Sequence, residues 1–288
     1  MSSVIRVGVF GAAGRMGSQV CRAVVADPET ELVAAIDPTS SGRDLGSLSV
    51  LGGEGIRIGS SVADMMSAGV DVAVDFTVAP SAMDNIRWCA THSVHAVVGT
   101  TGFSKDDMEE VAELFAERAA PAYSVSAAGP GDAAGRAHCV IAPNFSIGAV
   151  LMMRFAEIAA AHMDAAEIIE LHHDAKVDAP SGTSLSTARR IDASRRSVGK
   201  PDRGDPTVTS SLPGTRGGVT EGGVRIHAVR LPGLVAHQEV IFGGAGESLT
   251  VRHDSLDRAC FMPGVLMAVK RIATMPGLTI GIESIMGL

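Results

Sequence analysis

The first half of the chain alternates short apolar runs with longer amphipathic segments. Runs of Val, Ile and Ala, typical of strands buried on both faces, predict strands and their following turns at residues 4–10, 31–36, 70–77, 96–102 and 140–146. Helices are predicted between them at residues 18–26, 80–90 and 105–119. Because strands alternate with helices, we expect this half to form a parallel sheet of the α/β class.

The second half has a different pattern. After a helix predicted at residues 147–162, apolar and polar residues alternate with a period of two at 224–230, 236–242 and 246–253. Strands of this kind, with one covered face, predict an antiparallel or mixed sheet in a separate α+β domain. Between Asp192 and Gly218 we expect a polar loop rich in Gly and Pro.

The end of the chain is expected to return to the first domain. A helix at residues 263–274 and a short strand at 278–282 are predicted there. The first domain is therefore expected to be discontinuous, with residues 1–143 and 254–288. The second domain is then formed by residues 144–253.

A glycine-rich turn follows the first predicted strand directly. Gly11 permits a tight turn, Gly14 lets the backbone approach a pyrophosphate, and Gly17 allows close helix packing. The spacing GxxGxxG is a variant of the dinucleotide-binding pattern and is weak by itself, because a structural turn in another α/β fold can share it. Asp37 strengthens the interpretation, since a carboxylate at the end of the second strand can bind the adenosine ribose hydroxyls.

The residues near Asp37 bear on the choice of coenzyme. Pro38 stands where an arginine would pair with a 2′-phosphate, which favours NADH. Arg15 and Arg43 could still supply positive charge, so use of NADPH stays open.

The later strands end in Phe76 and Thr77, in a Gly-Thr-Thr-Gly turn, and in Ala-Pro-Asn-Phe. Open α/β sheets bind ligands at the carboxyl ends of their strands, so we expect the last two of these segments at the nicotinamide side.

Residues 167–183 hold the densest group of candidate catalytic side chains. The stretch is predicted to begin as a strand and to end in Ser-Gly-Thr, ahead of a helix that starts near Leu185. It carries His172, His173 and Lys176 within five residues. Imidazole and ammonium groups can move protons, and the amides of Gly182 and Thr183 at a helix N-terminus can bind a carboxylate. The stretch therefore suits a small dianionic substrate, although two histidines alone would more simply be a solvated strand end.

Composition excludes several classes of function. The net charge of −8 and the 3% aromatic content argue against a nucleic-acid surface. The four cysteines show no CxxC spacing, which argues against a zinc-ribbon or a thioredoxin-like protein. We expect them to be free thiols. No apolar run is long enough to span a membrane, and the first residues do not resemble a signal peptide. We therefore expect a cytoplasmic protein with no membrane partner.

Four motifs occur in order along the chain and together carry a resemblance to a known family. They are the glycine turn at residues 11–17, Gly-Thr-Thr-Gly at 99–102, Ala-Pro-Asn-Phe-Ser at 142–146, and the stretch 167–183 with its His-His-x-x-Lys-x-Asp-Ala-Pro-Ser-Gly-Thr block. The chain resembles the 4-hydroxy-tetrahydrodipicolinate reductase (dihydrodipicolinate reductase) family over nearly its whole length. The Arg-Gly-Gly at 216–218, His-Ala-Val-Arg at 227–230 and His-Gln-Glu-Val at 237–240 agree with it.

The resemblance implies a fold, a reaction and a set of residues. The fold is a Rossmann-like dinucleotide-binding domain with an α+β domain of mixed sheet that binds substrate and forms a homotetramer. The reaction is NADH- or NADPH-dependent reduction of 4-hydroxy-tetrahydrodipicolinate to tetrahydrodipicolinate in diaminopimelate and lysine biosynthesis. His172 is the implied acid/base and Lys176 the proton donor, while His173, Gly182 and Thr183 hold the substrate. The implied cofactor residues are Gly11, Ala12, Ala13, Gly14, Arg15, Met16, Asp37, Gly99, Thr100, Thr101, Ala142, Pro143, Asn144 and Phe145.

One segment departs from the family pattern. Residues 122–138 look like an insertion, rich in Gly, Ala, Pro and Ser, where the family needs only a short turn and strand. It is expected to enter the strand before Ala142 from the end opposite the cofactor. Deleting residues 127–136 should therefore leave activity largely intact, and a role in assembly stays open.

Three other interpretations of the sequence have less support. The first is another aspartate-pathway NAD(P)-dependent dehydrogenase, although no cysteine lies in a motif that would form a thioester. The second is a metal site at His172, His173, Asp174 and Asp178, which adjacent histidines and the charge of Lys176 disfavour. The third is a regulator that binds NADH without turnover, for which the chain offers no DNA-binding motif. We therefore predict an enzyme that contains no metal.

Overall fold

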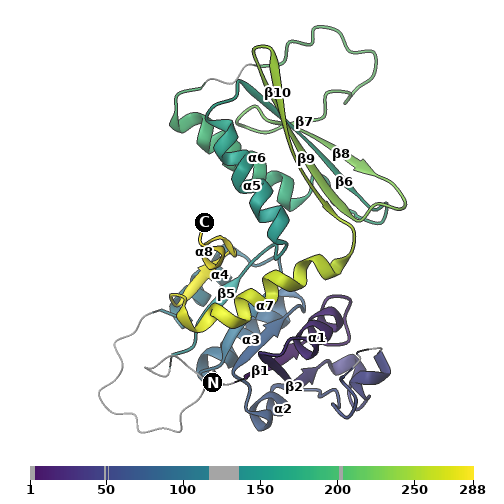
Figure 1. Ribbon diagram of the computed structural model, residues 1–288, viewed down its shortest axis with the longest axis vertical. Coiled ribbons are helices and arrows are strands. Elements are labelled where there is room, and N and C mark those ends of the chain that lie inside the picture. Colours follow the sequence, from purple (N-terminus) through teal and green to yellow (C-terminus); the bar gives the residue numbers. More distant parts are fainter. Residues whose placement is uncertain (1–3, 49, 51, 117–135, 201–203) are drawn as a thin grey trace. The chain divides into compact units, whose positions relative to one another are not determined.

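The structure is a computed structural model and describes residues 4–48, 50, 52–116, 136–200 and 204–288. It forms two compact units (Figure 1). Unit 1 contains Met1–Ser146 and Phe261–Leu288, and unit 2 contains Ile147–Cys260. The boundaries expected from the sequence lie a few residues before these, and the assignment of each unit to a ligand stays a prediction. None of the helices within the described residues is long and apolar enough to cross a membrane.

Unit 1 is built on a parallel sheet of six strands in the order β11-β5-β4-β3-β1-β2. The strands are β1 (Ile5–Phe10), β2 (Thr30–Ile36), β3 (Val72–Asp75), β4 (His95–Val98), β5 (Cys139–Ile141) and β11 (Leu278–Ile280). The main helices are α1 (Gly17–Ala26), α2 (Val62–Ala68), α3 (Ala79–Thr91), α4 (Lys105–Leu114), α7 (Met262–Arg271) and α8 (Glu283–Met286). Since β11 pairs with β5, the end of the chain completes this sheet, and the predicted Rossmann-like fold is confirmed.

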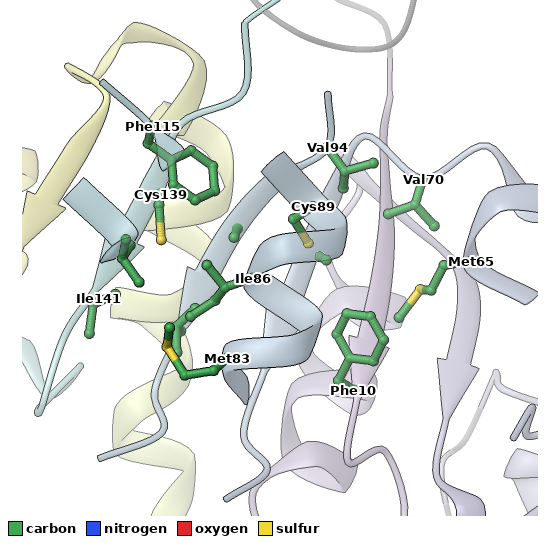
Figure 2. Packing of buried hydrophobic residues seen from close by; sticks show 14 of the residues in the cluster. Phe10, Met65, Val70, Met83, Ile86, Cys89, Val94, Phe115, Cys139 and Ile141 are labelled. Atoms are coloured by element: carbon green, nitrogen blue, oxygen red, sulfur yellow. The ribbon is translucent and has the colours of Figure 1, made fainter. Parts of the chain in front are cut away.

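Apolar side chains cover both faces of this sheet, as the uninterrupted apolar runs predicted. Phe10 and Ile36 lie on the face where Met65 of α2, Ile86 of α3 and Val111 of α4 form one core (Figure 2). Helices α1 and α7 contact each other and the strands, and so pack on the other face. Buried strands of this kind place their carboxyl ends, and the turns that follow, along one edge.

Unit 2 contains a mixed sheet of five strands in the order β10-β9-β6-β8-β7, which confirms the mixed sheet expected for the second half. Its strands are β6 (Ala165–His172), β7 (Gly218–Val219), β8 (Arg225–Arg230), β9 (Ala236–Gly244) and β10 (Glu247–Ser255). Strand β6 runs parallel to β8 and antiparallel to β9. Helices α5 (Ile147–Ala160) and α6 (Gly182–Ser197) bury Ala156 and Ile191 against Ile168, Val240 and Phe242 of the sheet.

Two expectations for the second half were wrong. The helix expected near Leu185 begins at Gly182, because the Ser181 side chain caps it by accepting a hydrogen bond from the Ser184 amide. The loop expected from Asp192 begins later, because α6 continues to Ser197. The polar composition of this helix concealed it, although Ala188, Ile191 and Arg195 are buried at helical spacing.

Two further expectations concern residues next to or within the undescribed segment 117–135. Helix α4, expected to reach residue 119, ends at Leu114. Ser104 begins it as predicted, since its side chain and that of Asp107 form a capping box. Of the insertion at 122–138, residues 122–135 lie outside the described part of the chain. The expected tolerance of a deletion at residues 127–136, and the expected position of the segment opposite the cofactor, therefore stay predictions.

Candidate active site

The glycine turn after β1 has the backbone geometry that its spacing predicts. Gly11 has φ +70°, a conformation that favours glycine, and its carbonyl accepts a hydrogen bond of 2.9 Å from the Gly14 amide. A methyl group on Gly17 would overlap the backbone of Gly11 and Ala12. The turn can therefore close onto the start of α1 only if residue 17 has no side chain.

The Asp37 carboxylate joins the end of β2 to this turn. One oxygen accepts a hydrogen bond of 3.1 Å from the Ala13 amide, and the other accepts from the amide and hydroxyl of Thr39 at 3.0 and 2.6 Å. Asp37 is only 8% exposed. The side chain predicted to bind ribose thus also holds the backbone amides of Ala13 and Thr39 in place.

A hollow of about 540 Å³ opens beside the glycine turn. Of the predicted cofactor residues, Gly11, Gly14 and Asp37 line it, together with Phe76 and Thr77 at the end of β3. Pro38, which the sequence analysis used to argue for NADH, also lines it. The lining further includes residues for which the sequence offered no specific signal, namely Thr39, Ser60, Ser61, Val62, Val78, Ser81, Asp84 and Asn85. The lining set contains neither Arg nor Lys. The size, the glycine backbone and the carboxylate fit the adenosine and pyrophosphate portion of a dinucleotide.

Asp75, which was not predicted, connects the neighbouring strand ends. It is 3% exposed and accepts hydrogen bonds from the Thr77 amide and hydroxyl, from the Asn85 amide group and from the Thr100 hydroxyl, at 2.7 to 2.9 Å. The sequence did carry a signal, because Asp75 ends an apolar strand in the same way that Asp37 follows one. This carboxylate brings the predicted residue Thr100 to the end of β3.

Two other predicted cofactor residues, Gly99 and Phe145, lie next to the ring of Phe76. Its ring lies so close to Gly99 that a side chain there would overlap it. The ring centroids of Phe76 and Phe145 are 5.9 Å apart. Asn144 accepts a hydrogen bond of 2.8 Å from the Ser146 amide. Gly99, Thr100 and Phe145 are thus gathered around the end of β3, whereas Ala12, Ala13, Arg15, Met16, Thr101, Ala142, Pro143 and Asn144 do not line the hollow.

In unit 2, the predicted catalytic residues lie at and just beyond the end of β6. His172 is the last residue of this strand, and its Nδ1 hydrogen-bonds Oε2 of Glu170. Glu170 is fully buried and accepts two hydrogen bonds of 2.8 Å from the guanidinium of Arg230 on β8. Sequence reasoning missed both Glu170 and Arg230 as site residues, because 60 residues separate them.

The charge of Glu170 follows from these contacts. Burial raises its pKa, but the hydrogen bonds from His172 and Arg230 outweigh burial and hold the pKa below the usual value of 4.5. The hydrogen bonds with Glu170 also raise the pKa of Arg230. Glu170 and Arg230 therefore form an ion pair at neutral pH.

Lys176 lies in the turn after β6 and pairs with Asp178. Its Nζ is 2.7 and 2.8 Å from the two carboxylate oxygens. The side chain of Lys176 is 20% exposed and that of Asp178 is 58% exposed. An ion pair with so exposed a partner is weak, so a substrate anion can compete with Asp178 for the lysine. The Lys176 amide donates to the His173 carbonyl at 3.2 Å, which keeps the turn compact.

A buried chain of hydroxyl and amide groups anchors the N-terminus of α6. The hydroxyls of Ser181 and Ser184 are 2.7 Å apart, Ser184 donates to Gln238 on β9 at 2.8 Å, and Gln238 donates to Thr187 at 2.7 Å. A methyl group on Gly182 would meet nothing within 4 Å. Gly182 and Thr183 therefore stand at the start of a firmly held helix, with open space beside Gly182.

Two alternative chemistries have little support in the described residues. Three of the four cysteines are buried, and burial raises the pKa of Cys21 to about 12 and that of Cys89 well above its usual range. A thioester-forming enzyme needs an accessible thiolate. Across residues 4–48, 50, 52–116, 136–200 and 204–288, no three His, Cys, Asp or Glu side chains are grouped as metal ligands.

Adding one methyl group at Gly17 should disrupt the dinucleotide turn. In Gly17→Ala the methyl group overlaps the Gly11 carbonyl, so the turn must move. We expect NADH binding, measured by fluorescence titration, to weaken by about tenfold or more. Ser18→Ala, one position further in α1, adds no bulk and is the matched control. Equal affinities in the two variants would contradict a role of the turn in binding.

The fold and these residues define a class of protein: a two-unit oxidoreductase with a Rossmann-like dinucleotide-binding unit. Comparisons with known proteins identify the family. Residues 5–126 match the family model described as dihydrodipicolinate reductase, N-terminus, and residues 148–286 match dihydrodipicolinate reductase, C-terminus. The chain belongs to the dihydrodipicolinate reductase (4-hydroxy-tetrahydrodipicolinate reductase) family.

Individual relatives match over the whole length of the chain. The 4-hydroxy-tetrahydrodipicolinate reductase of Cutibacterium acnes is 47% identical, covering 99% of this chain and 100% of the relative. That of Thermobifida fusca is 48% identical with the same coverage. Among solved structures, dipicolinate-bound dihydrodipicolinate reductase from Paenisporosarcina sp. TG-14 matches with a TM-score of 0.78 and 35% identity, covering 98% of this chain and 99% of that one.

Proposed function

We propose that this protein reduces 4-hydroxy-tetrahydrodipicolinate to tetrahydrodipicolinate, with loss of the hydroxyl group as water before or during the reduction, in diaminopimelate and lysine biosynthesis. The observation that carries the proposal is the arrangement in unit 2: His172, Lys176 and the N-terminus of α6 follow one another at the end of β6. Proton-donating groups and a carboxylate-binding helix end are what a small dianionic imine requires. Membership of the family supports the same reaction.

The cofactor is proposed to be a reduced nicotinamide dinucleotide, which supplies the hydride when bound. The backbone of Gly11, Gly14 and their neighbours is proposed to hold the pyrophosphate, with Asp37 on the adenosine ribose. Gly99 to Thr101 and Ala142 to Phe145 are proposed to hold the nicotinamide side. The open glycine backbone and the Phe76–Phe145 ring contact support this division of roles.

The residues of unit 2 are proposed to act on the substrate. The amides of Gly182 and Thr183 hold one carboxylate at the start of α6, and His173 hydrogen-bonds the substrate. When substrate binds, Lys176 leaves its ion pair with Asp178 and contacts the substrate instead. It then donates the proton that reduction requires. His172, backed by the ionised Glu170, acts as acid/base.

A single assay tests the reaction. The purified protein is mixed with substrate generated in situ, and oxidation of NADH and NADPH is followed by absorbance. Turnover with the tetrahydrodipicolinate precursor and none with an aspartate-pathway semialdehyde is the expected result. The reverse pattern would favour another aspartate-pathway dehydrogenase, and coenzyme binding without any turnover would favour a regulator.

Asp37 is proposed to set the coenzyme preference and to prevent a strong preference for NADPH. The 2′-phosphate of NADPH would approach a buried carboxylate, and neither Arg nor Lys lines the hollow. We expect NADPH to exceed NADH by no more than about tenfold in kcat/KM, which is about 1.4 kcal/mol. Asp37→Ser should move the ratio toward NADPH. Asp44→Asn, which changes a carboxylate bonded to the Gly46 and Gly55 amides, is the control. A larger preference for NADPH in the unchanged protein would refute the proposal.

The enzyme is proposed to work in the cytoplasm as a homotetramer joined through the sheet of unit 2. Alternate residues of β9, such as Val240 and Phe242, are buried beneath α5 and α6, whereas Ile241, Ile169 and Leu171 are only partly buried. A sheet face with partly exposed apolar side chains suits association with a second copy. Free cysteines suit a reducing compartment.

A further inference from the structure

Glu170 is the most deeply buried carboxylate in the neighbourhood of the catalytic motif. Its exposure is 0%, and both of its oxygens accept from Arg230, which lies opposite His172 in the pairing of β6 with β8. A carboxylate in such surroundings is stable as an anion only when it is paired and hydrogen-bonded. Arg230 provides both the charge and the two parallel hydrogen bonds.

The same carboxylate determines which nitrogen of His172 carries a proton. Oε2 of Glu170 contacts Nδ1 of His172, and an ionised carboxylate can only accept a hydrogen bond. Nδ1 must therefore be the donor, which leaves Nε2 of the neutral ring without a proton. The imidazole is then held as one tautomer and in one orientation.

The ion pair also holds the turn that leads to α6. Oε1 of Glu170 accepts from the Ser181 amide at 3.3 Å, and Arg230 donates to the Asp178 carbonyl at 2.7 Å. Asp178 is the partner of Lys176, and Ser181 caps α6. The Glu170–Arg230 pair thus contacts His172 and both ends of the segment between the lysine and the helix N-terminus.

Resting on the proposed function, we propose that Glu170 and Arg230 are positioning residues for the reduction. They hold His172 as the Nδ1–H tautomer, so that Nε2 is the nitrogen that exchanges a proton with the substrate. They also hold the Asp178–Ser181 turn, which sets the distance between Lys176 and the carboxylate-binding end of α6. Neither residue needs to touch the substrate.

Strand β6 contains a matched control for this arrangement. Glu167 also pairs with an arginine and a histidine, because it accepts from Arg216 and contacts Nε2 of His227 at 2.7 Å. The side chain of Glu167 is 35% exposed, and the hydrogen bonds and ion pairs observed for it involve none of residues 172–183. Glu167→Gln therefore removes a carboxylate of the same chemistry without touching the His172 cluster.

The first measurement is the tautomer of His172, read from ring 15N chemical shifts of histidine-labelled full-length protein without substrate. The His172 signal is assigned by its loss in His172→Ala. In the unchanged protein and in Glu167→Gln, the neutral ring should be the Nδ1–H tautomer. Glu170→Gln should show a mixture, because an amide can either donate to or accept from Nδ1. A ring protonated at Nε2 in the unchanged protein would overturn the proposal.

The second measurement is steady-state kinetics. Glu170→Gln should lower kcat by about 10–100-fold, the usual cost of losing the group that orients a functional histidine. The dissociation constant for NADH should stay unchanged, since the glycine turn and Asp37 belong to unit 1. Glu167→Gln should keep the kcat of the unchanged protein. Unchanged kcat and tautomer in Glu170→Gln would overturn the positioning role.

A third variant covers the case in which Glu170→Gln fails to fold because Arg230 is left buried without a counterion. The double variant Glu170→Gln with Arg230→Met removes both charges and leaves an apolar side chain. It should fold, lose the tautomer preference and show the same loss of kcat. If it instead has the kcat and the tautomer of the unchanged protein, the pair does not position His172. The proposed function fails separately, if the unchanged protein does not turn over its substrate while the Nδ1–H tautomer is present.

Discussion

Replacing Lys176 with alanine should lower kcat by about 10²–10⁴-fold, the range typical for loss of a positioned proton donor. The ammonium lies in the turn between His172 and the start of α6 and pairs only with the exposed Asp178 among the contacts observed for it. Binding of an anionic substrate can therefore draw it from that partner. Steady-state kinetics together with fluorescence titration of NADH will separate chemistry from coenzyme binding, and NADH affinity should hardly change.

Two further lysine variants sharpen this test. Lys176→Arg should also be poor, because the guanidinium keeps the charge but is too weak an acid to donate a proton. Lys105→Ala removes a lysine of unit 1 whose side chain is 86% exposed and pairs with Glu109, and it should leave kcat unchanged. A Lys176→Ala enzyme with the kcat of the unchanged protein would remove the lysine from the mechanism and leave the histidines as proton donors.

The two adjacent histidines should respond differently to replacement. His172→Ala should lower kcat by about 10²–10⁴-fold, because it removes the proposed acid/base group, whose Nδ1 hydrogen-bonds Glu170. His173→Ala should mainly raise KM, since His173 is assigned to substrate binding. Strand β6 ends at His172, so the alternation of side chains along a strand does not separate the two rings, and their different roles stay a prediction that this experiment tests.

The exposed His162 provides the control for both variants. His162→Ala should leave kcat and KM unchanged, which shows that loss of a histidine side chain in unit 2 has no general effect. An increase of KM alone in His172→Ala, together with a fall of kcat alone in His173→Ala, would reverse the two assignments.

Local patterns in the sequence predicted most of unit 1 correctly. The glycine at position 11 has the positive φ that its place after β1 required, and Asp37 ends β2 beside the turn. Such features can be read from a sequence because each depends on a few consecutive residues and on the period of burial in a strand. The end of the chain was expected to return to the first domain, and β11 does so by pairing with β5, a partner that the sequence did not indicate.

Predictions failed where a polar composition concealed regular structure. Asp192 was expected to begin a loop, yet it lies in α6 and is only 5% exposed. Ser, Thr and Arg dominate this helix, so its hydrophobic periodicity is weak. Its start at Gly182 depends on the cap by Ser181, which is anchored through Ser184 to Gln238, 54 residues further along the chain. The helix end is thus stabilised by tertiary contacts as well as by local preference.

The sequence by itself determined which residues are the candidates for chemistry: the glycine turn, Asp37, and the histidines and lysine at and after the end of β6. These groups are recognisable because their spacing along the chain reflects local backbone geometry. Only the tertiary structure decided how those groups are oriented and charged. The Glu170–Arg230 pair spans 60 residues and forms because β6 and β8 lie side by side. Asp75 likewise accepts from Asn85 of α3 and from Thr100 in the turn after β4. A buried carboxylate depends on whichever donors the fold brings to it, and no local pattern records that choice.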